Sequence, residues 1–410
     1  TSGEPVRRIM DSWIWQPGYP LVEARSDGDE LVLRQRRFAF DPEDASTSRW
    51  AIPIAVRQGD TTATVLLDGD EARLPLTGGP VVVNAGGHGF FRVAYADDLR
   101  ARLTASAVEE MSTLERYNLV DDAWNAVTAR TLDAAEYLTL VERFGAEREY
   151  GVWQAIAIGL RALRRLVIDD DAALAAFEQR VTALCEPVLT DLGPPVDGEP
   201  DLTAKLRGLL LGVVAVTGGD DGARADAREI YARWTADPSA VDAELAAAAT
   251  GVVAATGDAD DYERMLDQYR NGETPQVQLR HLYLLAEFEG DALMERTLQM
   301  AMGDEVKSQN APFMLRGAVG NLHQGRQAWE FVRRNWAQIN DRFPRNTISR
   351  IVETVRTHDR PADVAQSQAF FAEHPIEQAA KTLEQILERQ QVNADVRSHN
   401  EEPLKESLRR

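Results

Sequence analysis

Glu149-Tyr150-Gly151-Val152-Trp153 opens the stretch that decides the fold of this 410-residue chain. From there, apolar or small residues recur every three or four positions, which is the spacing of one face of an α-helix. They are Val152, Ile156, Gly159, Leu160 and Leu163. The spacing predicts a helix with one buried face.

A second apolar stripe supports the same fold class near the other end of the chain. Trp329, Val332 and Trp336 recur at positions i, i+3 and i+7. Around these stripes we expect on the order of sixteen helices of about 10–20 residues, joined by short turns. Helices in series stack as antiparallel pairs. Since no exact repeat occurs at a fixed period, we predict a large, irregular α-solenoid of HEAT-like stacked helix pairs.

Several helix ends are marked by their residue types. Thr274-Pro275 predicts an N-cap followed by proline at the first helical position. Ser239-Ala240-Val241-Asp242 resembles a capping box with aspartate in place of glutamate. Glycine is favoured just after a helix, so Gly257, Gly290 and Gly303 are expected at helix ends.

Residues 12–96 carry a different pattern, that of short strands. Leu31, Leu33 and Gln35 alternate with Val32, Arg34 and Arg36, which is the period of two expected of a half-buried strand. Asp27-Gly28 and Asp68-Gly69 suit tight hairpin turns because glycine accepts positive φ. Pro53 indicates an edge position or a bulge. Further strands are expected over residues 50–57, 62–67, 80–84 and 90–95.

These patterns predict a mostly α protein in two domains. We expect a small N-terminal β-sandwich over residues 1–96 and an α-helical, superhelical domain over residues 97–410. The segment 193–200 is rich in proline, glycine and acid residues. We interpret it as a long loop inside the helical domain rather than as a boundary.

Composition excludes some classes of function. The net charge is −21, and such an acidic surface repels phosphate backbones, so nucleic acid is not an expected partner. No segment approaches the roughly 20 apolar residues of a membrane span, so no membrane is expected either. With no signal peptide in view, cytoplasmic is the default location. The single cysteine, Cys185, lies in a helical stretch and is expected to be a buried small hydrophobe.

No catalytic or metal-binding motif was found in the sequence. The six histidines never form the i, i+4 pair of a helical zinc site, and no Gly-x-Ser-x-Gly elbow is present. His281 is expected to be a packing residue. Gly86-Gly87-His88-Gly89 is expected to be a turn, and Thr217-Gly218-Gly219 the end of a helix. We therefore expect no catalytic residues, no metal and no cofactor in this chain.

Two motifs in the strand region resemble a known family. Residues 10–20, Met-Asp-Ser-Trp-Ile-Trp-Gln-Pro-Gly-Tyr-Pro, resemble the start of the β-sandwich that follows the catalytic domain in zinc aminopeptidases of the aminopeptidase N family. Residues 84–95, Asn-Ala-Gly-Gly-His-Gly-Phe-Phe-Arg-Val-Ala-Tyr, resemble the segment that ends this sandwich. The two motifs lie at the spacing that the family shows.

Three further motifs in the helical region agree with this resemblance and follow in the expected order. Residues 147–153 are similar to the family's Glu-x-[Asp/Glu]-Tyr-x-x-Trp, and residues 329–336 to its Trp-x-Phe-[Leu/Val]-x-x-Asn-Trp. Residues 306–310 resemble its basic-x-Gln-Asp stretch, with Asn310 in place of the acid. Asn321-Leu322 departs from the family's Asn-Pro, and the terminal helix lacks a common tryptophan.

The resemblance implies the C-terminal half of such an enzyme. The family's zinc site, substrate-amine anchor and transition-state tyrosine belong to an upstream catalytic domain, so zinc is implied there and not in this chain. The implied partners are that upstream domain and peptide substrates. The chain starts at Thr1 without methionine, which favours an excised fragment of a longer protein.

The resemblance also suggests which residues contact peptide. It places Lys307, Gln309 and Arg316 in the region that lines the family's substrate chamber. A peptide carboxylate needs a cation, and arginine can bind it with two hydrogen bonds. The competing interpretation is that Lys307 and Arg316 are surface residues that balance nearby acids such as Asp304 and Glu305.

Two hypotheses about function follow. The first is a non-catalytic C-terminal portion of a zinc aminopeptidase, which encloses the active-site chamber and restricts or orients peptides. The second is a stand-alone helical-repeat scaffold or peptide-binding module without peptidase activity. An open reading frame that continues upstream of Thr1 into a His-Glu-x-x-His motif would distinguish them.

Overall fold

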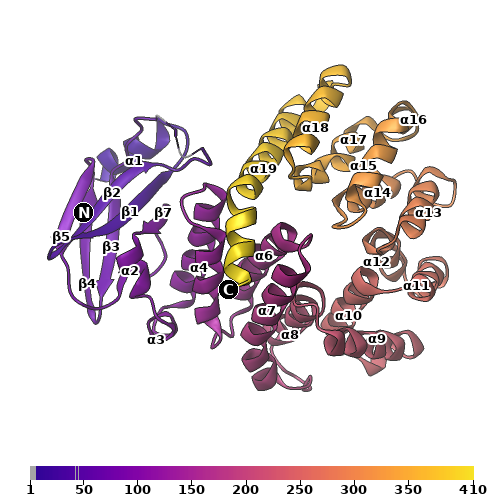
Figure 1. Cartoon of the computed structure of the whole chain (residues 1–410), viewed down its shortest axis with the longest axis horizontal. Helices are drawn as coiled ribbons and strands as arrows, with labels where there is room; N and C mark the ends of the chain where they lie inside the picture. The colour runs from indigo at the N-terminus through magenta and orange to yellow at the C-terminus, as the bar shows by residue number, and fades with distance from the viewer. Residues whose placement is uncertain (1–5, 42, 45) are drawn as a thin grey trace. The chain divides into compact units, whose positions relative to one another are not determined.

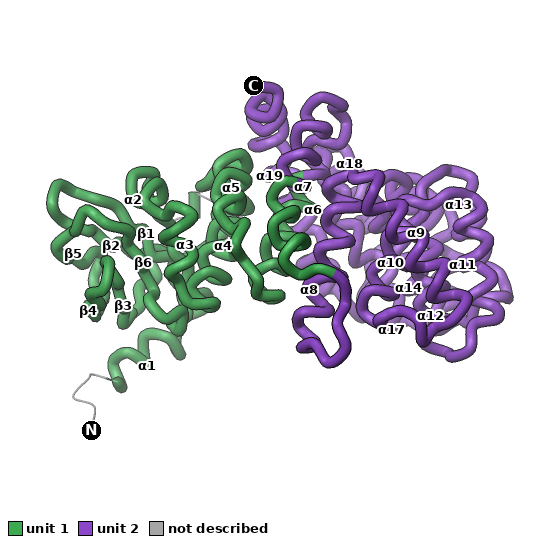
Figure 2. The backbone as a smooth tube through the Cα atoms, turned by 90° about the horizontal axis from the view of Figure 1, so that it is seen from below, with its two compact units in different colours: residues 1–163, 183–193 green, residues 164–182, 194–410 purple. Residues whose placement is uncertain are grey.

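The computed structural model describes residues 6–41, 43–44 and 46–410. By its contacts the chain divides into two compact units (Figure 2). Unit 1 holds the residues up to 163 together with residues 183–193, and unit 2 holds residues 164–182 and 194–410. The division therefore falls within two helices, α6 (Tyr150–Val167) and α7 (Asp171–Leu192).

Unit 1 contains the sheet-forming part of the chain (Figure 1). Its strands are β1 (Pro20–Asp27), β2 (Glu30–Arg37), β3 (Ile52–Gln58), β4 (Thr61–Leu67), β5 (Glu71–Pro75), β6 (Val81–Val83) and β7 (Arg92–Tyr95). They form a four-stranded sheet in the order β5-β2-β1-β7 and a three-stranded sheet in the order β4-β3-β6. Strands β1 and β7 are parallel, and the other pairs are antiparallel.

The core of the two sheets follows from the side-chain alternation. Leu31 and Leu33 of β2 and Ile52 and Ile54 of β3 belong to one buried cluster, so each sheet turns its apolar face toward the other. The predicted small sandwich is confirmed. Pro53 lies where β3 pairs with β4 alone, because β6 pairs only with Val56–Gln58. It is thus locally at an edge, as expected for a residue that lacks an N–H.

One turn assignment was wrong. Asp27-Gly28 does begin the β1–β2 hairpin, with Gly28 at a φ of +60°. Asp68-Gly69, by contrast, joins β4 of one sheet to β5 of the other. The Gln35 side chain donates to Gly69 O at 2.8 Å, which helps hold this crossing segment against the neighbouring sheet. The tight hairpin in this region lies at Gly59, between β3 and β4.

Short helices complete unit 1 before the chain enters α6. They are α1 (Val6–Ile14), α2 (Asp97–Ala101), α3 (Ala105–Glu109), α4 (Thr113–Thr128), α5 (Ala134–Val141) and the 3-10 turn η1 (Glu142–Phe144). Secondary structure changes from strand to helix at Asp97, and the contacts group α2 to α5 with the strands. A domain boundary at residue 96 stays a prediction.

The regular secondary structure of unit 2 is all helical in the residues that the structure describes. Its α-helices after α7 are α8 (Asp201–Gly212), α9 (Asp221–Ala236), α10 (Ala243–Thr256), α11 (Ala259–Asn271), α12 (Pro275–Leu284), α13 (Asp291–Met302), α14 (Ala311–Gly320), α15 (Gly325–Arg334), α16 (Trp336–Arg342), α17 (Arg345–Ile351), α18 (Pro361–Glu373) and α19 (Ala380–Leu408). Its other helical turns are η2 (Val213–Thr217), η3 (Pro238–Ala240), η4 (Leu285–Glu287), η5 (Glu353–Thr357) and η6 (Glu377–Ala379).

Neighbouring helices of unit 2 stack against one another. Helix α10 contacts α8 and α9, α11 contacts α12, α14 contacts α13 and α15, and α18 contacts α19 (Figure 1). This confirms the predicted mostly α fold with a stacked, solenoid-like helical part. The array also returns on itself, since Arg397 of α19 donates to the carbonyl of Arg165 at 2.5 Å. In the residues described, every helix is too short or too polar to cross a lipid bilayer.

The helix ends test the boundary signals one by one. Thr274 caps α12, with Pro275 at its first position, and Gly257 and Gly303 end α10 and α13 as predicted. The prediction of a capping box at residues 239–242 was wrong, because Asp242 itself is the N-cap of α10. Gly290 precedes α13 instead of ending a helix.

Candidate functional site

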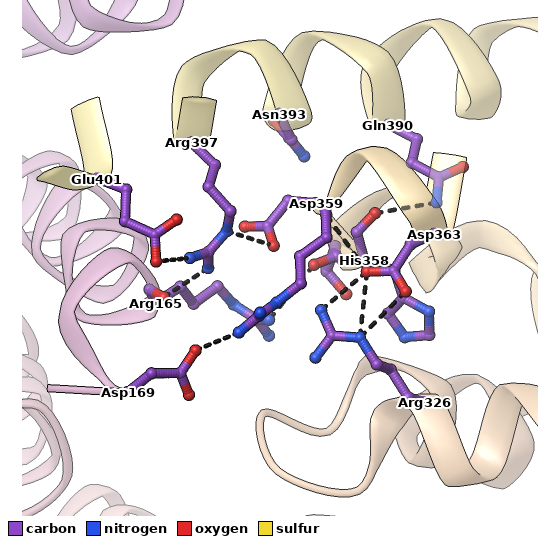
Figure 3. A network of polar contacts seen from close by, with 12 residues as sticks. Arg165, Asp169, Arg326, His358, Asp359, Asp363, Gln390, Asn393, Arg397 and Glu401 are labelled. Carbon is purple, nitrogen blue, oxygen red and sulfur yellow. Dashed lines mark hydrogen bonds and ion pairs between the residues drawn. The ribbon is translucent and has the colours of Figure 1, made fainter. Parts of the chain in front are cut away.

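A polar cavity of about 430 Å³ lies within unit 2, where the first residues of the unit meet the last (Figure 3). Its charged and histidine lining comes from four parts of the unit: the end of α6 with the turn after it, the α14–α15 turn with the start of α15, the segment after η5, and α19. These residues are Arg164, Arg165, Asp169, His323, Arg326, His358, Asp359, Arg360 and Arg397.

The centre of this lining is a buried ion pair. Arg397 Nε donates to Asp359 Oδ1 at 2.9 Å, and Arg397 Nη1 lies 3.0 Å from Glu401 one helical turn along α19. Both Arg397 and Asp359 are more than 90% buried. Burial alone would lower the pKa of Arg397, but Asp359 and Glu401 outweigh it and raise that pKa. The guanidinium therefore stays charged and fixes α19 to the segment after η5.

Arg165 differs from the other arginines of the cavity. Its Nη2 donates to Gly320 O at 3.1 Å and its Nη1 to Thr357 O at 3.5 Å. Among the described residues, no carboxylate oxygen lies within 4 Å of its guanidinium. Burial lowers the pKa of Arg165, since Asp359 compensates only in part and Arg397 and Arg326 add repulsion. Arg165 is thus a half-buried cation without a paired acid.

His358 is held as a neutral ring. Its Nε2 lies 2.8 Å from Val319 O, and Nε2 must be the donor because a carbonyl oxygen can only accept. In the neutral ring the other nitrogen, Nδ1, then carries a lone pair and can only accept. Burial lowers the pKa of His358. Its backbone carbonyl accepts from Gln390 at 2.9 Å, which adds another link to α19 (Figure 3).

Two further ion pairs flank the histidine. Arg326 of α15 donates three hydrogen bonds to Asp363 of α18, the shortest at 2.8 Å, and Arg360 pairs with Asp169. The hydrogen bonds to Arg326 keep the pKa of Asp363 below its ordinary value against the effect of its burial. The arrangement offers guanidinium donors and one imidazole acceptor. It can bind and orient an anion, and it lacks a nucleophile paired with a base.

The residues predicted to contact peptide lie outside this cavity. Lys307 and Gln309 are exposed in the turn before α14, and Arg316 is half-buried in the middle of α14. Arg316 Nε lies 3.0 Å from Glu353 of η5. Among the described residues, Lys307 has no carboxylate within 4 Å. The acids proposed as balancing partners, Asp304 and Glu305, pair instead with Arg342 and Arg270.

Sequence reasoning missed Arg165, Asp359 and Arg397 because they are far apart in the chain. Arg165 and Arg397 are 232 residues apart, and no local pattern links them. One signal was present: Arg164-Arg165 interrupts the apolar stripe of α6 between the buried Leu163 and Leu166. Arginines beside such a stripe need partners from elsewhere in the fold.

The motif at residues 147–153, one of those that carry the family resemblance, has a structural role in unit 1. Glu147 is 4% exposed and accepts two hydrogen bonds from Arg116, at 2.6 and 3.2 Å. Its Oε1 also accepts from the backbone N–H of Arg148 and Glu149 at 2.8 Å, so it caps the start of α6. Trp153 is fully buried and donates to Glu147 O at 3.1 Å.

The sandwich motif is structural as well. Arg92 of β7 donates to Asp121 at 2.6 Å, to Asp122 at 3.0 Å and to the Tyr19 hydroxyl at 3.1 Å. Asp122 also accepts from the backbone N–H of Val93 at 2.9 Å, and its burial raises its pKa to about 7 even though Arg92 and that N–H act against the rise. These contacts join the sheet to α4.

Other residues singled out in the sequence are structural. Cys185 is buried, which raises the pKa of its thiol to about 12. His281 stacks on Trp234 and donates from Nδ1 to Val277 O at 2.7 Å. Gly86 and Gly87 form the turn between β6 and β7, and Thr217 ends η2. Within the described residues, no group of three or more His, Cys, Asp or Glu side chains could hold a metal ion.

Comparison with known proteins gives relatives that are named aminopeptidases. Aminopeptidase M1 of Arabidopsis thaliana is 27% identical over 427 residues, which cover 96% of this chain and 48% of the relative. Glutamyl aminopeptidase of Sus scrofa is 25% identical over 428 residues, or 99% of this chain and 45% of the relative. The chain thus spans about half the length of the curated relatives it matches. The sequence pattern of the ERAP1-like C-terminal domain matches residues 80–392. The chain therefore belongs to the ERAP1-like C-terminal domain family.

Proposed function

We propose that this chain is the non-catalytic C-terminal portion of an aminopeptidase, and that it encloses a substrate chamber and restricts or orients peptides. One observation carries the proposal: nearly the whole chain aligns with proteins named aminopeptidases, yet it spans only about half of each. A stacked helical array provides the curved surface that enclosure needs.

An exposed apolar surface on unit 1 supports an upstream partner domain. Helix α1 has no buried residue, and Val6, Met10 and Ile14 recur along it at i, i+4 and i+8. Beside it, Trp15 is 80% exposed and Phe90 is 74% exposed. Contiguous exposed apolar groups of this size are typical of surfaces that bind another protein or domain. An upstream catalytic domain is the occupant that the half-length alignment suggests.

Zinc does not belong to this chain in the proposal. The described residues hold no cluster of three ligand side chains, so they do not fit the metal that the family resemblance implies. We place zinc, the activated water and the chemical step in the upstream domain.

The peptide-contact role of Lys307, Gln309 and Arg316 remains part of the proposal. Near these residues, the half-exposed ring of Phe313 lies 6.1 Å from that of Tyr283. Tyr283 donates to Asn310 at 3.5 Å, at the start of α14. Cationic, amide and aromatic groups at one helix start are suited to a peptide's carboxylate, backbone and apolar side chains.

A reconstitution experiment tests the main proposal. The chain alone should give no turnover of aminoacyl-chromogenic substrates in excess zinc, and it should associate with the separately expressed upstream region. Trp15→Asp should weaken that association without unfolding the chain, because Trp15 is exposed. Val196→Asp, on a 65% exposed side chain of the 193–200 loop, is the matched control. Chelator-sensitive turnover by the chain alone would refute the proposal.

A second experiment tests the peptide contacts in the enzyme that includes the upstream region. Arg316→Ala should raise KM for long peptides and leave dipeptide-sized substrates unchanged. Arg334→Ala is the control, because this side chain is 64% exposed and, among the described residues, pairs only with Glu330. An equal effect at all lengths, or none, would assign Arg316 to its ion pair with Glu353 alone. Peptide binding by a chain that has no upstream region would favour the stand-alone module.

A further inference from the structure

The arginines that line the unit 2 cavity differ in whether they form an ion pair with a carboxylate. Arg164 lies 3.1 Å from Glu178, Arg326 is bound by Asp363, Arg360 by Asp169, and Arg397 by Asp359 and Glu401. Within the described part of the chain, Arg165 donates only to backbone carbonyls. The two acids of the lining, Asp169 and Asp359, are each already engaged by an arginine. The cavity therefore keeps one guanidinium whose charge no neighbouring carboxylate neutralises directly.

Polar atoms without partners line the same cavity. His358 Nδ1, Gln324 Oε1 and Arg164 Nε are each buried and make no hydrogen bond among the described residues. The His358 side chain is more than nine-tenths buried, at 4% exposure. Buried polar groups are nearly always satisfied by protein, by water or by a ligand. A ligand here would need acceptors for the guanidinium groups and at least one donor for the imidazole.

A phosphate group meets both needs. Near neutral pH it carries anionic oxygens for arginine and, when singly protonated, a hydroxyl that can donate. A carboxylate offers acceptors only and would leave His358 Nδ1 unpaired. A volume of about 430 Å³ is that of a small-molecule pocket, larger than one phosphate ion requires.

We infer that this cavity is a binding site for a phosphate group, held by Arg165 with Arg164 and Arg360 and oriented by His358. The shared chemistry covers two sources, inorganic phosphate and a small phosphomonoester. The site is separate from Lys307, Gln309 and Arg316, and it does not depend on the aminopeptidase proposal. A ligand there would touch both the first and the last segments of unit 2, which only the folded unit brings together.

Calorimetric titration of the whole chain tests this inference with inorganic phosphate, glycerol phosphate and acetate at matched ionic strength. We expect saturable binding of phosphate or of glycerol phosphate, and the tighter of the two identifies the source. Bound ligand should also raise the melting temperature of unit 2, because it binds the folded state alone. Equal binding of acetate, or no saturable binding of either phosphate compound, would overturn the assignment.

Variants locate the site. Arg165→Ala should weaken phosphate binding about tenfold or more, as expected for loss of a charge-assisted hydrogen bond. Arg165→Lys keeps the charge and should retain part of the affinity. Arg334→Ala, at an exposed position outside the cavity, should change nothing. If Arg165→Ala perturbs folding, Arg360→Ala provides the second measurement, and unchanged affinity in a folded variant of either kind would refute the site.

Discussion

The two units bury charge in different ways. In unit 1, Arg92 is enclosed by Asp121, Asp122 and Tyr19, and each of these partners is within hydrogen-bond distance. In unit 2, Arg397 and Asp359 form a comparable pair, yet a cavity of about 430 Å³ lies beside them. The unit 1 cluster joins a strand to a helix, and the unit 2 cluster joins helices distant in sequence.

The difference separates structural charge from charge available to a ligand. A buried ion pair is weak evidence for function, since its attraction mainly offsets the cost of removing two charges from water. Both clusters contain such pairs. Only the unit 2 cluster combines them with an unpaired guanidinium and a space that a ligand could fill, and that combination distinguishes a site from a structural contact.

The largest effect is expected from breaking the unit 1 cluster. Arg92→Ala leaves the Asp122 carboxylate buried without its cation, and we expect a loss of about 3 kcal/mol in the free energy of unfolding. Urea unfolding measured by tryptophan fluorescence gives this value. Arg25→Ala, at a 39% exposed arginine of β1, is the control and should cost little. A loss below about 1 kcal/mol for Arg92→Ala would mean that the cluster is not structural.

The second contrast between the units is the space around a helical glycine. Gly159→Ala in unit 1 would place a Cβ 2.2 Å from the buried Tyr137 hydroxyl, so the two helices must shift. We expect a cost of about 2 kcal/mol. Gly212→Ala in unit 2 meets nothing within 4 Å and should be neutral or stabilising, since alanine favours helix. Equal effects on the melting temperature would contradict the contrast.

Breaking the unit 2 pair should cost less than breaking the unit 1 cluster. After Arg397→Ala, water in the cavity can solvate Asp359, and the nearby charge of Arg165 remains. We expect a loss of about 1.5 kcal/mol, as for a charge-assisted hydrogen bond in a partly hydrated place. The same urea experiment measures it. If Arg397→Ala lowers the free energy of unfolding as much as Arg92→Ala does, water in the cavity does not solvate Asp359.

The smallest effect is a difference in pH dependence. Burial raises the pKa of Asp122 to about 7, so between about pH 4 and 7 the folded state binds more protons than the unfolded chain. The stability that Asp122 contributes is therefore fully present below about pH 4 and is lost as the pH rises to about 7. Burial lowers the pKa of His358, so its contribution is complete above about pH 6.5 and is lost as the pH falls.

Hydrogen exchange measured separately for the two units as a function of pH checks this difference. Asp122→Asn should flatten the dependence in unit 1, and His358→Gln should flatten it in part in unit 2. A partial change is expected there because burial also lowers the pKa of His281. Parallel pH profiles in the two units, unchanged by either variant, would contradict the assignment.

The sequence specified most elements and little of the cavity. The period of two located β2 correctly, although Val32 is buried together with Leu31 and Leu33 and burial alternates only from Leu33 to Gln35. It missed β5, which has only five residues and whose two apolar side chains, Ala72 and Leu74, are only partly buried against the core. The stripe from Trp329 to Trp336 is buried as expected, but the helix breaks at Asn335 between α15 and α16, which periodicity alone does not reveal.

The cavity was beyond sequence reasoning for a physical reason. Arg165, His358 and Arg397 meet only because the helical stack curves, and curvature sums many small rotations between neighbouring helices. Lys307, Gln309 and Arg316 came from family resemblance, which identifies positions without their contacts. Neither approach could have given the partner of Arg316, because Glu353 is distant in sequence.

The return of α19 to the start of unit 2 has a consequence for biosynthesis. Arg165 is made 232 residues before Arg397, and Asp170 is made 239 residues before Arg409, its ion-pair partner. A ribosome releases the N-terminal helices long before their partners exist, and domains fold as their residues emerge. The groups of this segment that pair with α19, the carbonyl of Arg165 and the carboxylate of Asp170, therefore stay without these partners until α19 has been synthesised. We expect a nascent chain truncated before α19 to expose this segment to protease, and a chain that includes α19 to protect it.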